Sequence, residues 1–168
     1  VYEQRGPKDI NLFIDYSTRA SGRTLELGCG TGRVLIPTAL AGCEITGLDL
    51  SSYMLRKCQE KLNKQPRAVQ ERVRLSHGNM TSFDTGETYS LVTIPFRAFQ
   101  HLISTEEQKA CLSCINKHLS PRGQLIIDIF HPFPPRLVPN PKYTAEEEDL
   151  PETKLPDGRK LRTASRIA

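Results

Sequence analysis

The stretch LELGCGTGR, from Leu25 to Arg33, places three glycines at alternate positions directly behind a short apolar run. The apolar run predicts a buried strand over 23–28, and the glycines predict a tight turn from this strand into a helix. Because glycine has no Cβ, such a loop also lets the backbone approach a ligand closely. The stretch therefore predicts the first strand, loop and helix of an α/β sheet with a ligand at the loop.

Four further strands are predicted along the chain, and most of them are separated by amphipathic helices. Each strand ends where the sequence turns to glycine, proline or polar residues. The last of them is a nearly unbroken apolar run, which predicts burial on both faces. These strands are expected over 44–51, 73–79, 89–95 and 124–130. Strands that alternate with helices predict a doubly wound parallel sheet.

Helix boundaries are predicted from capping residues. Thr31 is expected to cap the helix after the glycine loop, and Gly42 is expected to end it. Ser51 is expected to cap the next helix. Ser104 and Glu107 have the spacing of a capping box for the helix that carries CLSC, and the SPRG that follows is expected to be a turn.

Composition limits the classes of function. The chain has 168 residues with 38% hydrophobic and 25% charged residues, which is typical of one ordinary globular core. Lys and Arg (23) exceed Asp and Glu (19) only slightly, so no nucleic-acid surface is expected. No run reaches the ~20 apolar residues of a membrane span. The five cysteines, an odd number, favour reduced thiols and a cytoplasmic protein, and neither CLSC nor the acidic EEED is expected to hold a metal.

Two carboxylates indicate what the loop binds. Asp49 closes the second strand about 20 residues after the loop, where an acidic side chain accepts hydrogen bonds from ribose. Glu26 lies two residues before Gly28, and a carboxylate there disfavours the pyrophosphate of a dinucleotide. The spacing is also GxGxG and not GxGxxG. A nucleoside that carries positive charge, such as S-adenosylmethionine, fits both carboxylates better.

The order of motifs resembles the class I S-adenosylmethionine-dependent methyltransferases. The matching segments are LELGCGTGR, ITGLDLSSYML, HGNM, YSLVTIPFRAFQHL and LSPRGQLIIDIF. The resemblance implies a Rossmann-like methyltransferase fold over 1–131 and S-adenosyl-L-methionine as the cofactor. It implies that the glycines line the methionine half of the cofactor, that Asp49 holds the ribose, and that Leu50 and Met80 flank the adenine. The implied cofactor residues are Glu26, Gly28, Cys29, Gly30, Gly32, Arg33, Asp49, Leu50, Asn79, Met80 and Pro95.

The sequence departs from the family pattern in several places. Asn79 stands where the family usually has an aspartate against the adenine amine, and we expect it to accept through its amide oxygen. YSLV and SPRG replace the more usual forms of their motifs. The last two strands of the family sheet are not found, so residues 132–168 are expected to form a proline-rich segment and a β-hairpin on the substrate side. TKLPDGRKLR supplies the two short strands of that hairpin, and the free sheet edge that remains suggests a homo-oligomer.

The chemistry expected is in-line transfer of a methyl group to a small molecule, for which positioning can suffice without an obligatory acid or base. Candidate catalytic or substrate residues follow the fourth and fifth strands: Arg97, His101 and His131, with Phe96 beside them. Arg97 could hold a substrate carboxylate. The segment after the fourth strand lacks the Asn-Pro-Pro-Tyr type of motif expected for methylation of adenine or glutamine. Two alternatives remain: an NAD-dependent oxidoreductase and a non-catalytic nucleoside-binding module.

Overall fold

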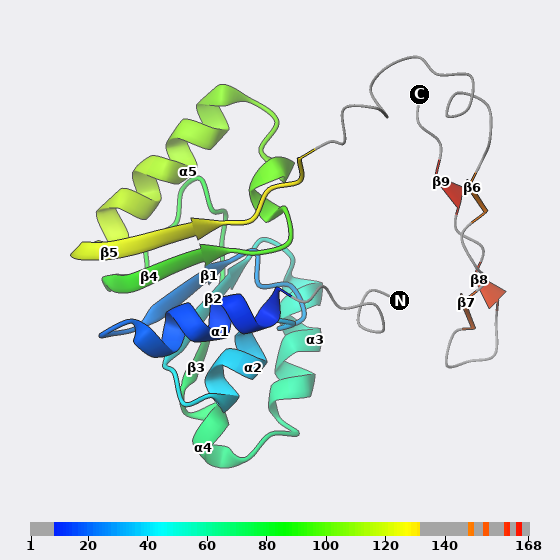
Figure 1. The fold of residues 1–168 in the computed structure, drawn as a ribbon, viewed down its shortest axis with the longest axis horizontal. Helices are drawn as coiled ribbons and strands as arrows, with labels where there is room; N and C mark the ends of the chain where they lie inside the picture. Colours follow the sequence, from blue (N-terminus) through cyan, green and yellow to red (C-terminus); the bar gives the residue numbers. More distant parts are fainter. Residues whose placement is uncertain (1–8, 132–147, 150–152, 155–159, 162–163, 166–168) are drawn as a thin grey trace. The chain divides into compact units, whose positions relative to one another are not determined.

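The computed structural model describes residues 9–131 and four two-residue strands between 148 and 165. The chain divides into two units: the larger one is Pro7–Phe130, and the smaller one comprises the rest of the chain. The larger unit contains a sheet with helices on both faces (Figure 1). Within the described part of the chain, no helix is both long and apolar enough to cross a membrane.

The sheet of the larger unit has five parallel strands in the order β3-β2-β1-β4-β5, which confirms the expected doubly wound sheet. Strand order reverses beside β1, because β2 and β4 pair with its two edges. In such sheets, ligands bind outside the carboxyl ends of the strands at the reversal. The strands are β1 (Thr24–Leu27), β2 (Ile45–Asp49), β3 (Val73–His77), β4 (Tyr89–Ile94) and β5 (Leu119–Ile127).

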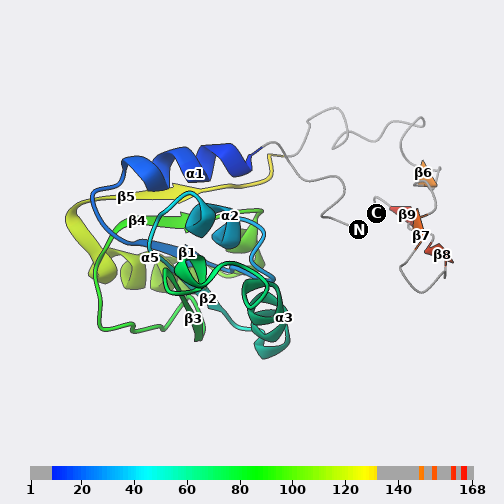
Figure 2. The same ribbon diagram turned by 90° about the horizontal axis from the view of Figure 1, so that it is seen from below.

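Helices cover the two faces of this sheet and create two hydrophobic clusters. Figure 2 shows α1 above β5 and β4, and α5 below them. One cluster joins α5 to β1 and β4 through residues such as Leu25, Val92 and Ile115. The other joins α2, α3 and α4 to β2 through residues such as Leu35, Ile45 and Cys58. The helices are α1 (Ile10–Arg19), α2 (Leu35–Leu40), α3 (Ser52–Leu62), α4 (Arg67–Gln70), the 3-10 helix η2 (Ala98–His101) and α5 (Thr105–His118).

Most of the predicted helix caps are confirmed. The Ser51 hydroxyl accepts from the Met54 amide at 3.3 Å, and Ser104 and Glu107 form the expected capping box. Gly42 follows α2 with a φ of +97°, as a helix-ending glycine requires. The prediction for Thr31 is wrong, because α2 begins only after a turn, at Leu35.

The prediction for the fifth strand is wrong in two respects. SPRG is no turn: it lies inside β5, which begins at Leu119 and pairs with β4 through an irregularity in register between Tyr89 and Leu91. The strand is also only half-buried, not buried on both faces. The cause is its position, because β5 is the last strand in the order and pairs with β4 alone among the described strands.

The smaller unit contains two short antiparallel pairs. β7 (Thr153–Lys154) pairs with β8 (Lys160–Leu161), which confirms the two strands expected around the Pro-Asp-Gly turn. β6 (Glu148–Asp149) pairs with β9 (Ala164–Ser165). The proline-rich segment expected over 132–147 lies outside the described residues.

Candidate functional site

A pocket of about 620 Å³ opens at the carboxyl ends of β1, β2 and β4, where the strand order reverses. Most of the residues that line it come from the loops directly after these strands and after β3. Predicted cofactor residues among them are Gly28, Gly30, Asp49, Leu50, Asn79, Met80 and Pro95. Further lining residues, not predicted from the sequence, are Leu48, Ser51, Met54, Gly78, Ala98, Leu102 and Glu107.

The glycine loop is shaped by close approach as well as by backbone twist. Gly28 has a φ of +72°, and a Cβ there would lie 2.7 Å from the Cβ of Ala98 in the segment after β4. Gly32 has a φ of +82° and packs against Cys58 of α3, away from the pocket lining. Gly30 has a φ of +54°, yet a Cβ there would meet nothing within 4 Å. Gly30 therefore leaves open space on the pocket side of the loop, which a ligand can fill.

Asp49 holds the glycine loop and the start of α3 together. Its Oδ2 accepts from the Gly30 amide at 2.7 Å, and its Oδ1 accepts from the Ser51 amide at 2.8 Å. A carboxylate has about four acceptor positions, so each oxygen can accept one more hydrogen bond. Asp49 thus presents two fixed acceptors to the pocket, which is the arrangement that a ribose diol requires.

Glu26 is a buried carboxyl group directly behind this loop. It is only 2% exposed, and its Oε2 has no hydrogen-bond partner among the described residues. Burial raises the pKa of Glu26 to about 8; the Arg33 charge lowers it in part and the Asp49 charge raises it further. An unpaired buried carboxyl group is costly in a folded protein and marks a candidate functional position. A cationic ligand at the loop would favour its charged form.

Four of the predicted cofactor residues do not line the pocket, and two of them, Arg33 and Cys29, support the loop from outside it. The Arg33 guanidinium donates to both carboxylate oxygens of Asp9, each at 3.0 Å, which ties the start of α1 to the loop. Cys29 is buried against β2, and burial raises the pKa of its thiol far above its ordinary value. Glu26, Cys29, Gly32 and Arg33 thus lie outside the lining itself.

Asn79 lines the pocket, but its expected acceptor is already engaged. Its Oδ1 accepts from both the amide and the hydroxyl of Thr81, each at 2.9 Å. An amide oxygen has two lone pairs, so neither is left for an adenine amine. The expected hydrogen bond through the Asn79 oxygen is therefore not available in this arrangement. The polar group that remains is the side-chain NH₂, a donor.

The segment after β4 forms one wall of the pocket in a strained conformation. Phe96 and Arg97 have φ values of 51° and 63°, in the left-handed region that side chains disfavour by on the order of 1–3 kcal/mol each. The Phe96 amide donates to Asp128 Oδ2 at 3.0 Å, which holds the turn against the end of β5. Gln100 adds a two-way contact, because its side chain accepts from the Phe130 amide at 2.6 Å and donates to the Phe130 carbonyl at 3.2 Å.

The three candidate catalytic residues are not brought together. His101 lines the pocket, and Arg97 stands beside the lining residue Phe96 without lining it. His131 belongs to the smaller unit and is not among the lining residues. In the described part of the chain, no three His, Cys, Asp or Glu side chains gather as a metal site.

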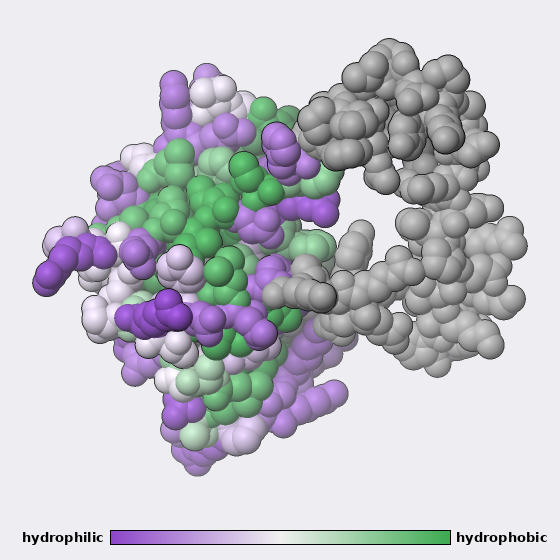
Figure 3. All heavy atoms as spheres, in the orientation of Figure 1, coloured by the Kyte–Doolittle hydropathy of each residue, from purple (hydrophilic) through white to green (hydrophobic). Residues whose placement is uncertain are grey.

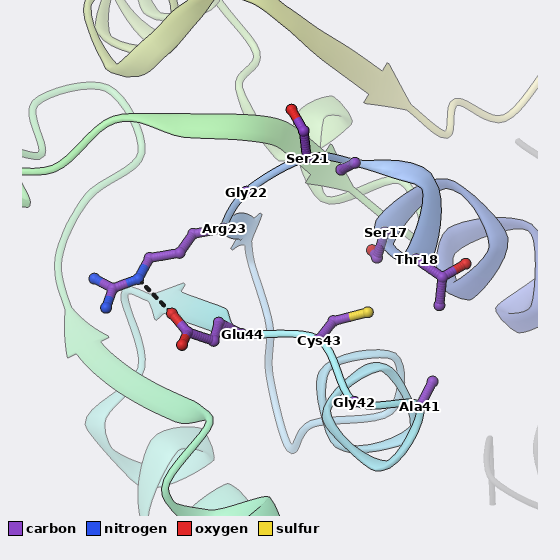
Figure 4. Close-up of a pocket in the computed structure, with 10 residues that line it drawn as sticks. Ser17, Thr18, Ser21, Gly22, Arg23, Ala41, Gly42, Cys43 and Glu44 are labelled. Carbon is purple, nitrogen blue, oxygen red and sulfur yellow. Dashed lines mark hydrogen bonds and ion pairs between the residues drawn. The ribbon is translucent and has the colours of Figure 1, made fainter.

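A second pocket of about 410 Å³ lies at the opposite edge of the sheet, beside the amino ends of β1 and β2. Figure 4 shows its polar wall, in which the Arg23 Nε donates to Glu44 Oε2 at 2.7 Å. Arg23 also pairs with Glu87 at 2.5 Å, and Glu87 pairs with Arg74. Because these pairs are largely solvated, they contribute little to stability, and they have the character of a surface network rather than of a ligand site.

Fold and site together define a nucleoside-binding α/β domain. A glycine loop, a carboxylate at the end of β2 and a buried carboxyl group behind the loop meet at the reversal of strand order. Comparison with known proteins agrees with this class: a family model described as a methyltransferase domain matches residues 25–125. The chain belongs to this family of methyltransferases, which confirms the resemblance seen in the motifs.

Individual relatives are similar over most of the chain. The putative methyltransferase YqeM of Bacillus subtilis is 30% identical over 82% of the chain and 55% of its own length. A dTDP-3-amino-3,6-dideoxy-alpha-D-glucopyranose N,N-dimethyltransferase of Streptomyces fradiae is 29% identical over 80% of the chain and 49% of its own length. The solved structure of SAM-bound CalS10, an amino pentose methyltransferase from Micromonospora echinaspora, is 30% identical over 77% of the chain and 54% of CalS10, with a TM-score of 0.65. The chain spans about half the length of these relatives.

Proposed function

We propose that the chain binds S-adenosylmethionine in the pocket beside the glycine loop and transfers its methyl group to a small-molecule acceptor. The observation that carries the proposal is Glu26, a buried carboxyl group whose Oε2 has no partner among the described residues, directly behind a loop that leaves space at Gly30. A dinucleotide would place a phosphate there, and that negative charge would oppose ionisation of Glu26, whereas a cationic group would favour it. The bound cofactor would supply an electrophilic methyl group.

The lining residues suggest how the cofactor is held. Asp49 offers one free acceptor position on each oxygen for the ribose hydroxyls. Leu50, Met54 and Met80 supply apolar surface for a flat base beside the end of β2. Asn79 can donate its NH₂ group to a ring nitrogen, in place of the acceptor expected from the family pattern.

Catalysis would rest chiefly on positioning. Holding two reacting groups in line is worth up to about 7 to 11 kcal/mol in favourable cases, and methyl transfer from a sulfonium needs little more. His101 is the candidate base at the pocket, and Arg97 beside Phe96 is the candidate for acceptor binding. We assign His131 to the acceptor side only through its sequence position after β5.

Several properties of the whole protein belong to the same proposal. Relatives named for dTDP-amino sugars support a small-molecule acceptor, and we take the hairpin strands after residue 131 as a substrate-side insertion. The outer edge of β5, which pairs with no further strand among the described residues and over which apolar residues gather in Figure 3, supports pairing with a second copy of the chain. Five free cysteines support a reducing, cytoplasmic setting.

The experiment is to follow release of S-adenosylhomocysteine with a panel of small amines, alcohols and carboxylic acids. We expect turnover with at least one acceptor, and we expect Asp49→Ala to lower it when the cofactor is subsaturating. Cofactor binding without turnover of any acceptor would favour the non-catalytic nucleoside-binding module. Equal turnover by Asp49→Ala and the unaltered chain would contradict the proposed cofactor site.

A further inference from the structure

Arg97 is held in an unusual place beside the cofactor pocket. It precedes η2 with a φ of 63° and a ψ of 15°, directly after Phe96, which lines the pocket. The strained turn is fixed from the end of β5 by Asp128 and by the contact between Gln100 and Phe130. These bonds hold the backbone of the turn from which the Arg97 side chain projects.

Two arginines stack on the same ring, and only one of them has a carboxylate among the described residues. The Arg33 guanidinium lies 5.0 Å from the Phe96 ring centroid and is neutralised by both oxygens of Asp9. The Arg97 guanidinium lies 5.6 Å from the Phe96 centroid and 4.8 Å from the Phe130 centroid. No ion pair or hydrogen bond of the Arg97 side chain occurs within the described part of the chain.

The stacking leaves the hydrogen-bonding groups of Arg97 available. An aromatic ring contacts a guanidinium through its π face, whereas the N–H donors lie in the guanidinium plane. This planar fork matches a carboxylate or phosphate in bidentate geometry. The rings of Phe96 and Phe130 also restrict the side chain, so less rotamer freedom is lost when an oxyanion binds.

We infer that Arg97 binds an oxyanion of the methyl acceptor, a carboxylate or a phosphate, and so determines the substrate class of the site. This inference rests on the proposed function. Asp49 and Glu107 give the pocket itself negative charge, which favours a cationic cofactor and disfavours an anion. An acceptor anchored at Arg97 therefore keeps its oxyanion outside the pocket and directs its neutral nucleophile inward.

The first test is titration of the protein saturated with S-adenosylhomocysteine, followed through the Nε–H signals of its arginines by NMR. Sodium benzoate and sodium pyrophosphate are the two probes, and loss of a signal in Arg97→Lys assigns Arg97. We expect a saturable shift of the Arg97 signal with at least one probe. Tighter binding of benzoate would indicate a carboxylate site, and tighter binding of pyrophosphate a phosphate site. Arg122, exposed on β5, is the control. No saturable shift, or an equal shift at Arg122, overturns the inference.

The second test compares matched acceptors that differ in one oxyanion, such as an amino acid with its decarboxylated amine and glucosamine 6-phosphate with glucosamine. Arg97→Gln should lower kcat/KM by about tenfold or more for the member of each pair that carries the oxyanion, because the substitution removes a charge-assisted bidentate contact. The value for the member that lacks the oxyanion, and the affinity for S-adenosylhomocysteine, should be unchanged. Arg122→Gln carries the same change of charge and should alter neither.

These outcomes separate the inference from the function on which it rests. If S-adenosylhomocysteine does not bind at all, the proposed function fails first. If S-adenosylhomocysteine binds normally while Arg97→Gln leaves the preference for the oxyanion-bearing acceptor intact, only the assignment of Arg97 fails. Where no acceptor of the panel is turned over, the titration decides.

Discussion

Replacement of Glu26 by glutamine should remove a pH-dependent cost from the folded chain. Burial raises the pKa of Glu26 from 4.5 to about 8. A carboxyl group with a raised folded pKa contributes stability that is fully present below pH 4.5 and is lost as the pH rises towards 8. At ~1.4 kcal/mol per pKa unit, the loss reaches about 3 kcal/mol at pH 7 as an upper value. The glutamine side chain in Glu26→Gln does not titrate, so residue 26 should not lower the free energy of unfolding of this variant as the pH rises.

The assay is urea unfolding of both chains at pH 5, 6, 7 and 8. We expect the free energy of unfolding of Glu26→Gln, relative to the unaltered chain, to increase by about 1 kcal/mol or more per pH unit between pH 5 and 7. A constant offset reflects how well the amide is accommodated and is not part of the prediction. Glu71→Gln, at an exposed position directly after α4, removes the same charge and should give no such slope.

Parallel pH profiles for Glu26→Gln and the unaltered chain would refute the reasoning, because they would show that Glu26 ionises normally when the chain folds. A second readout concerns the ligand. Since a cationic ligand favours the charged carboxylate, binding of S-adenosylmethionine, whose sulfonium and amino groups are both cationic, to the unaltered chain at pH 7 should release protons. Calorimetry in buffers of different ionisation enthalpy measures that release, which Glu26→Gln should abolish.

Three further substitutions test single contacts. Asp49→Ala should weaken binding of S-adenosylhomocysteine by roughly 1 to 3 kcal/mol in calorimetry, because ribose hydroxyls lose a charged acceptor, and unchanged affinity would contradict the ribose assignment. Asn79→Asp keeps one oxygen for Thr81 and replaces the side-chain NH₂ by an oxygen that can accept from an adenine amine. The same titration should therefore show equal or tighter binding of S-adenosylhomocysteine. A tenfold loss of affinity would contradict the placement of the adenine beside residue 79. Tyr89→Phe removes a buried hydroxyl that has no partner among the described residues. In chemical unfolding, the free energy of unfolding should be unchanged or higher by up to ~1 kcal/mol. A loss above ~1 kcal/mol would show that the hydroxyl has a hydrogen-bond partner.

The sheet could be predicted from the sequence because its signals are local. Apolar runs ended by glycine or polar residues mark β1 to β4, and Ser51 and Ser104 mark helix starts through bonds that span three residues. α1 was not predicted although its sequence is amphipathic, and its buried residues Phe13 and Ser17 belong to a helix that packs against α2 and β4. The start of β5 was missed because the strand includes SPRG, whose proline and glycine are typical of a turn, and pairing with β4 overrides that local preference.

The site was predicted where a residue follows directly from its strand. Gly30 and Asp49 lie at strand ends, so the parallel sheet brings them together. The family resemblance assigned Arg33 to the cofactor. Its ion pair with Asp9 could not be predicted, because the two residues are 24 positions apart and no local signal connects them. Met54 and Glu107 line the pocket because the caps of α3 and α5 fix where these helices begin. The Asn79 turn, in contrast, is a local asparagine-to-threonine pattern that the sequence contained.

Calorimetric titration of the purified chain with S-adenosylhomocysteine and, separately, with NAD tests the central claim most directly. The buried Glu26 and the open space at Gly30 favour a nucleoside that carries a positively charged amino group and no phosphates. We predict saturable binding of S-adenosylhomocysteine and binding of NAD at least tenfold weaker, a difference of about 1.4 kcal/mol. Tighter binding of NAD would contradict the account.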